Sequence, residues 1–156
     1  MSTRANFLVK LDADHYQQYY CHCDGYSHGL GEDLRKMIVY SIGLQTFFPT
    51  TLLRDIVNDT ISLHVREDNN GCGSYNREDI FSLKDRHGLH GDIEYLYVID
   101  FTFQKGCTLY GKACWHNYKS WNDYSSSEYI TLEDVIKDIC KSENMLDLTK
   151  RITRKD

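Results

Sequence analysis

Hydrophobic and polar residues alternate over residues 5–11 and again over residues 15–22. The apolar side of the first run consists of Ala5, Phe7, Val9 and Leu11. Leu8 is the one apolar residue on its other side. A period of two with one apolar face is typical of a half-buried strand. Because residues 12–14 between the two runs favour a turn, the pattern predicts an antiparallel hairpin.

Helical spacing replaces the alternation further along the chain. One predicted helix has an apolar face made by Leu30, Leu34, Met37, Ile38 and Ile42. This helix is predicted to end near Gly43. A second, short helix is predicted to begin at Thr50 or Thr51. Its inward side consists of Leu52, Leu53, Ile56 and Val57. A third helix is predicted to begin at Thr131, which forms an approximate capping box with Asp134.

The clearest strand covers residues 92–103, and a partner strand at 107–110 follows a turn at 104–106. The apolar side of this strand consists of Ile93, Tyr95, Tyr97, Ile99, Phe101 and Phe103. A short strand at 61–65 is also expected. The order of these elements predicts an α+β fold, in which two hairpins build an antiparallel sheet and the helices pack on one face.

Length, charge and cysteine content narrow the class of protein. The 156 residues predict a single domain over 1–156, with a polar, glycine-rich loop at 67–91 and a basic tail at 148–156. The net charge of −5 argues against a nucleic-acid partner. No apolar run reaches the roughly 20 residues of a membrane span, and the first residues do not resemble a signal peptide. The six cysteines are irregularly spaced, so we expect reduced thiols in a cytosolic protein and no membrane partner.

The densest set of reactive side chains lies at residues 20–31, where the second strand pattern ends. His22 and Asp24 form a His-x-Asp pair there, and His90 and Asp92 form another pair before the clearest strand. If the two strands are neighbours in the sheet, both pairs meet at one edge. Imidazole and carboxylate together bind divalent metals or act as acid and base. The simpler alternative is that His22 and Asp24 only fix the turn.

The sequence contains no standard catalytic or cofactor motif. Cys21 and Cys23 share one face of a strand while His22 lies on the other, which disfavours a zinc site. The glycines between residues 25 and 31 match neither pattern of a phosphate-binding loop. No nucleophile elbow occurs. We therefore assign no catalytic residue, no metal ligand and no cofactor, and we expect a binding protein rather than an enzyme.

Several motifs occur together in the order of a known family. The chain contains Met1-Ser2-Thr3-Arg4-Ala5, Tyr20-x-His22-x-Asp24-Gly25-Tyr26 and His90-Gly91-Asp92-Ile93-Glu94-Tyr95-x-Tyr97. Over residues 1–34 and 88–100 it resembles a family of small uncharacterised phage and prophage proteins, whose members carry M-[SG]-T-R-A, Y-x-H-W-D-G-Y-P and H-G-D-x-E-Y-x-Y. The chain departs from this pattern at Cys23 and Ser27, where the family has Trp and Pro.

The resemblance implies a phage-encoded accessory protein that acts in the host cytoplasm. It groups as one ligand-binding site the residues His22, Asp24, Gly25, Tyr26, His90, Asp92 and Tyr95. We expect a non-enzymatic protein that binds a host protein or a small nucleotide-type signal and acts against a host defence system.

Two other functions stay open. One is a small metal-assisted or acid–base phosphoesterase that uses both His-x-Asp pairs. The other is a structural, virion-associated protein, in which the motif only fastens the hairpin to the helix. The strand at 5–11, if it is an edge of the sheet, would also allow a homodimer.

Overall fold

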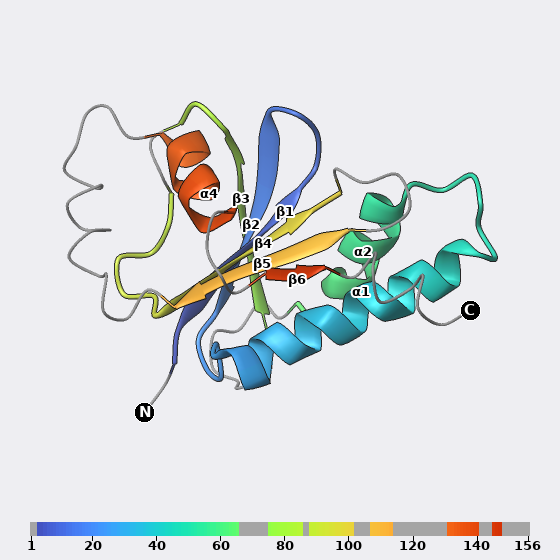
Figure 1. Cartoon of the computed structure of the whole chain (residues 1–156), viewed down its shortest axis with the longest axis horizontal. Helices are drawn as coiled ribbons and strands as arrows, with labels where there is room; N and C mark the ends of the chain where they lie inside the picture. The colour runs from blue at the N-terminus through green and yellow to red at the C-terminus, as the bar shows by residue number, and fades with distance from the viewer. Residues whose placement is uncertain are drawn as a thin grey trace.

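A computed structural model describes residues 3–65, 75–85, 88–101, 107–113, 131–140 and 145–147 (Figure 1). The strands are β1 (Ala5–Lys10), β2 (His15–Cys21), β3 (Tyr75–Ser82), β4 (Tyr95–Asp100), β5 (Thr108–Ala113) and β6 (Met145–Asp147). The helices are α1 (Glu32–Gln45), α2 (Leu53–Ser62) and α4 (Leu132–Cys140), and a π-helical turn (Ser27–Gly31) precedes α1. No helix in the described part of the chain has the length and apolar character needed to cross a membrane.

The strands form one mixed, mostly antiparallel sheet in the order β3-β2-β1-β4-β5-β6. The α+β class is confirmed, and so are the two predicted hairpins, β1 with β2 and β4 with β5. Parallel pairing of β1 with β4 joins the hairpins, with Ala5 opposite Tyr95 and Val9 opposite Ile99. β1 is therefore an interior strand rather than an edge. The sequence allowed a homodimer in which residues 5–11 pair with a second copy of the chain. This pairing is not possible in the structure, because β1 is already hydrogen-bonded to β2 along one edge and to β4 along the other.

Helices cover both faces of the sheet, whereas the sequence predicted helices on one face only (Figure 1). α1 and α2 pack on the face that carries Phe7 and Val9. α4 packs on the opposite face, against Leu8, Leu96 and Val98. The physical reason is that β1 and β4 carry apolar side chains on both sides, as interior strands buried between two layers do. Leu8, the exception in the alternating pattern, is fully buried in the second layer.

Several boundaries differ from the predicted ones. β4 begins at Tyr95, later than predicted, and Ile93 is buried in the cluster under α4 rather than beside Tyr95. α2 continues to Ser62, so the predicted strand at 61–65 is wrong. A helix forms there because its buried residues are spaced as one helical face, at Ile56, Val57, Thr60 and Ile61. The N-cap of α2 is Leu52 rather than one of the threonines before it.

The range 67–91, predicted as a polar loop, contains the edge strand β3. Its backbone pairs with β2 in antiparallel register, with Tyr75 opposite Cys21. An edge strand keeps one side toward water, and polar residues there protect it from pairing with other chains. This is why the composition of β3 resembles that of a loop. The turn at 104–106, the tail at 148–156 and the remaining residues of 66–74 and 86–87 lie outside the described residues.

Two of the predicted helix signals are confirmed. At the start of α4, Thr131 Oγ1 accepts a hydrogen bond from the backbone N–H of Asp134 (3.3 Å), and Asp134 Oδ2 accepts one from the backbone N–H of Thr131 (3.3 Å). This is the reciprocal geometry of a capping box. The apolar face of α1 is also confirmed, because Leu34, Met37 and Ile38 are buried in the cluster between this helix and the sheet.

We predict that Leu8→Ala destabilises the protein by about 2–5 kcal/mol, because it leaves a cavity between the sheet and α4. The free energy of unfolding is measured by urea denaturation. Ile80→Ala is the control, since Ile80 is exposed on β3 and its truncation should cost less than about 0.5 kcal/mol. Equal effects of the two substitutions would contradict a packed layer under α4.

Candidate functional site

The two His-x-Asp pairs emerge from the same edge of the sheet. β2 ends at Cys21 and β4 begins at Tyr95, and both residues lie opposite Ala5 at the start of β1. His22 directly follows β2 and His90 lies shortly before β4, so the two segments lie at the same end of the strands. The parallel pairing of β1 with β4 decides this, because it sets the start of β4 level with the end of β2.

Tyr20, near the end of β2, contacts both histidines. Its ring stacks on the imidazole of His90, with the ring centroids 4.2 Å apart and the planes inclined by 21°. Its hydroxyl oxygen lies 3.3 Å from Nδ1 of His22. We refer to Tyr20, His22, Glu78 and His90 together as the histidine edge.

Glu78 of β3 connects the histidine edge to the interior of the sheet. Its Oε1 accepts hydrogen bonds from Asn6 Nδ2 (3.1 Å) and Gln18 Nε2 (2.8 Å). Its Oε2 pairs with Nε2 of His90. Sequence reasoning missed Glu78 because β3 was predicted as a loop. The available signal was the two amides on interior strands, Asn6 and Gln18, since buried amides need polar partners.

His90 is held on three sides. Its backbone N–H donates to Asn6 Oδ1 (2.9 Å), its ring stacks on Tyr20, and its Nε2 pairs with Glu78. A carboxylate only accepts hydrogen bonds, so Nε2 carries the hydrogen of the neutral ring and Nδ1 keeps a lone pair. No described residue hydrogen-bonds to Nδ1, and the side chain is 37% exposed. The structure thus presents an imidazole in one fixed orientation at the surface.

Gln18 of β2 holds both Glu78 and the loop before β4 through its side-chain amide. Its Nε2 donates both to Glu78 Oε1 (2.8 Å) and to the backbone oxygen of Gly88 (2.7 Å). Because both partners are acceptors, the orientation of the amide is fixed. Its Oε1 is buried and has no hydrogen-bond partner in the described part of the chain. The amide therefore carries a desolvation cost while it holds β3 and the loop before β4 in place.

Burial and the nearby charges together set the pKa of the Tyr20 hydroxyl. Burial raises the pKa of Tyr20 to about 12, and the nearby carboxylates of Asp92 and Glu78 also raise it, while Arg4 lowers it. Asp92 itself forms an ion pair with Arg4, with 3.3 Å between the carboxylate oxygen and the guanidinium nitrogen. Asp92 therefore acts on the histidine edge through its charge, and its closest described charged partner is Arg4.

Asp24 and Gly25 build the turn that leads to α1. Asp24 has a φ of 59°, and its backbone oxygen accepts a hydrogen bond from Leu30 N (2.8 Å). Gly25 N donates to Thr3 O (2.8 Å). A Cβ on Gly25 would lie 2.7 Å from Cβ of Ala5, so only glycine fits at this position. Asp24 and Gly25 therefore hold the turn through backbone hydrogen bonds.

Tyr26 and Tyr95 also stand apart from the histidine edge. Tyr26 is the N-cap of the π-helical turn, and its backbone oxygen accepts a hydrogen bond from Gly29 N (3.0 Å). Tyr95 stacks on Tyr97, with 6.2 Å between the ring centroids, and packs against the cluster under α1 and α2. Alternation along β4 places Tyr95 on the face opposite Tyr20. The seven predicted site residues therefore do not form one group. His22 and His90 belong to the histidine edge, and Asp92 lies near it. Asp24, Gly25 and Tyr26 form the turn before α1, and Tyr95 packs under α1 and α2.

Metal-ligating residues do not gather at this site in the described residues, where no group of three or more His, Cys, Asp or Glu side chains could hold a metal ion. Cys21 is buried under α1, and burial raises the pKa of its thiol to about 12. Its Sγ donates to the backbone oxygen of Cys23 (2.9 Å).

No protein-family model, curated protein or solved structure significantly matches the chain. The resemblance to the phage family stays a prediction from motifs. The chemistry of the site therefore has to be inferred from its geometry.

We predict that Tyr20 ionises near pH 12 rather than pH 10, and that Asp92→Asn lowers its pKa by removing a nearby negative charge. Because the folded-state pKa is raised, the associated stability is complete below about pH 10 and is lost as pH rises toward 12. Tyrosine-labelled ¹³C NMR titration measures this, with Tyr20→Phe to assign the signal. A Tyr20 pKa that stays the same in Asp92→Asn would contradict the assigned surroundings.

Proposed function

We propose that this chain is a phage-encoded accessory protein that binds a host protein in the host cytoplasm and thereby counters a host defence. The phage setting is supported by the three motifs. The binding role is supported by one observation above the others: Glu78, Tyr20 and Asn6 hold His90 in place while its side chain stays 37% exposed. A preorganised acceptor costs little entropy when a partner's hydrogen-bond donor reaches it.

The charges around the histidine edge favour a protein over a nucleotide-type signal. Glu78 and Asp92 both carry carboxylates there, and the nearby cation, Arg4, is already paired with Asp92. Carboxylates repel the phosphates of a nucleotide. They attract the donors that a protein surface supplies, such as a lysine ammonium or a backbone N–H.

Each residue of the histidine edge has a distinct part in this proposal. His90 accepts a hydrogen bond from the partner, and Glu78 holds its ring in one orientation. Tyr20 supplies an aromatic face and positions His22 through its hydroxyl. Asp24 and Gly25 keep the turn in place without touching the partner.

We predict that His90→Ala weakens binding of the host protein at least about tenfold, because one oriented hydrogen bond to a charged or polar partner is lost. The tagged protein is expressed in a bacterial host, and the co-purified host protein is quantified and then titrated. The control is His15→Ala, since His15 is exposed and its ring bonds Asp12 (3.0 Å) at the other end of β2.

His90→Phe accompanies these variants, because it keeps an aromatic ring on Tyr20 while removing the acceptor. Circular dichroism confirms that each variant is folded. Unchanged binding in folded His90→Ala and His90→Phe would refute the proposed site. A loss of stability without loss of binding would favour the structural, virion-associated role instead.

The pairing of Glu78 with His90 supports one alternative function, although the carboxylates at the histidine edge oppose the approach of a phosphate. A carboxylate that orients a half-exposed histidine is the arrangement of a general base, so an acid–base phosphoesterase would use His90 with Glu78. The pairing of Asp92 with Arg4 makes Glu78, rather than Asp92, the orienting residue.

For this alternative we predict that the purified protein releases phosphate from nucleotides and that Glu78→Gln lowers the rate at least about 100-fold. Phosphate release is measured across nucleotide mono-, di- and cyclic phosphates, with and without added Mg²⁺ or Mn²⁺. Asp14→Asn, an exposed carboxylate in the β1–β2 turn, is the matched control. An absence of turnover under all these conditions would refute the phosphoesterase.

A further inference from the structure

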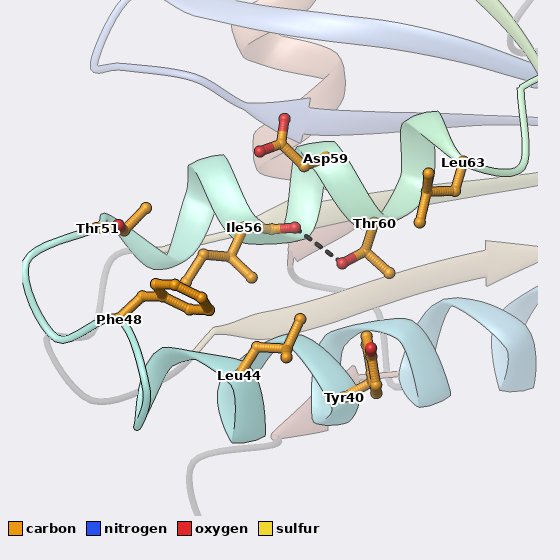
Figure 2. Close-up of a pocket in the computed structure, with 8 residues that line it drawn as sticks. All are labelled: Tyr40, Leu44, Phe48, Thr51, Ile56, Asp59, Thr60 and Leu63. Atoms are coloured by element: carbon orange, nitrogen blue, oxygen red, sulfur yellow. Dashed lines mark hydrogen bonds between the residues drawn. The ribbon is translucent and has the colours of Figure 1, made fainter.

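A groove of about 380 Å³ lies between α1 and α2 (Figure 2). Tyr40 and Leu44 of α1 line one side of it, and Ile56 and Leu63 of α2 line the other. Phe48, in the connection between the helices, lies at one end of the groove. Because Tyr40 and Leu63 are exposed, the groove opens to the outside of the helical layer.

The surface around this groove collects most of the exposed apolar side chains. Seven large hydrophobic residues are exposed in the described part of the chain, and five of them lie between residues 40 and 63. We refer to these five residues together with the groove as the apolar patch. They are Tyr40, Phe47, Phe48, Leu52 and Leu63. Such a concentration marks an interaction surface, whereas single exposed apolar residues do not.

The apolar patch is built from an uncharged part of the chain. Residues 37–53 contain no Asp, Glu, Lys, Arg or His, and no other stretch of the sequence without these residues is as long. Among the described residues that line the groove, Asp59 alone is charged, and its carboxylate points away from α1 (Figure 2). Arg54 and Asp55, which follow the uncharged stretch, form an ion pair with each other (3.6 Å). The patch therefore presents apolar surface with no charge directed into the groove.

This lack of charge favours a second copy of the chain as the partner. In a two-fold dimer the same surface meets itself, so each charge near the axis faces a like charge. The net charge of −5 opposes the approach of two copies, and an uncharged surface is where they meet with the least repulsion. A different protein is usually selected by complementary charges, and the groove offers none to it.

The exposed area agrees with the size of a dimer interface. Tyr40, Phe47 and Phe48 are 59%, 78% and 56% exposed, which leaves roughly 400 Å² of aromatic surface to be covered at about 200 Å² per side chain. Leu52 and Leu63 add to this area. A stable interface covers about 800 Å² on each partner, and its centre is enriched in Tyr and Phe and depleted in charge. The patch supplies the apolar centre of an interface of that size.

We propose that the apolar patch is the interface of a homodimer, in which α1 and α2 of one copy pack against α1 and α2 of a second copy about a two-fold axis. The second copy covers Phe47 and the opening of the groove. This proposal does not depend on the histidine edge. The patch belongs to the helical layer over Phe7 and Val9, whereas Tyr20 packs against the cluster under α4.

Sedimentation equilibrium of the full chain tests the proposal. We expect a monomer–dimer equilibrium with a dissociation constant below about 100 µM, as an apolar interface of standard size allows. Raising NaCl from about 0.05 M to about 0.5 M should tighten the dimer roughly two- to fivefold, because salt screens the repulsion between two acidic copies. An association that depends on ion pairs would respond to salt in the opposite direction.

Two variants locate the interface. Phe47→Asp should raise the dissociation constant at least about tenfold, because it brings two carboxylates into the contact. Leu63→Ser should raise it about tenfold by removing an apolar contact. Both positions are exposed, so circular dichroism should show wild-type folding. Ile80→Ser, an exposed position on β3, is the matched control and should leave the dimer unchanged. His90→Ala should also leave it unchanged, so failure of the histidine-edge proposal would not alter this result.

Three outcomes would overturn the proposal. They are a wild-type chain that stays monomeric at about 200 µM and high salt, a dimer that neither Phe47→Asp nor Leu63→Ser weakens, and a dimer that salt dissociates. A monomeric chain is then mixed with vesicles of neutral phosphatidylcholine. Binding to these vesicles that Phe47→Asp abolishes would assign the apolar patch to a lipid surface instead of a second copy.

Discussion

The structure depends on the parallel pairing of β1 with β4. This contact joins two local hairpins into one sheet and places both strands in its interior, so that each must be apolar on two sides. Leu8 and Leu96 are buried against α4 for this reason, while Phe7 and Tyr97 are buried toward α1 and α2. The same pairing sets the start of β4 level with the end of β2, which brings His22 and His90 to one edge.

Polar groups in the sheet carry the candidate site. Glu78 takes hydrogen bonds from Asn6 and Gln18 and pairs with His90, so two interior strands, an edge strand and a loop are tied to one carboxylate. Burying these amides costs free energy, and the unpaired Oε1 of Gln18 adds to that cost. The network holds an exposed imidazole in one orientation. Such preorganisation suits recognition, and it would equally suit proton transfer.

Local patterns in the sequence determined the β1–β2 hairpin, the apolar face of α1 and the Thr131–Asp134 capping box, because each depends on residues near in the chain. They also predicted that the two His-x-Asp pairs would meet at one edge if their strands were neighbours. In the structure β1 lies between β2 and β4, and its pairing with both strands brings the two pairs to the same end of the sheet. Only the tertiary structure decided that α4 covers the second face, that Glu78 lies on a strand, and that Tyr95 faces away from His90. Those features follow from contacts between distant residues, such as the bond between Asn6 and His90, and local periodicity contains no information about such pairings.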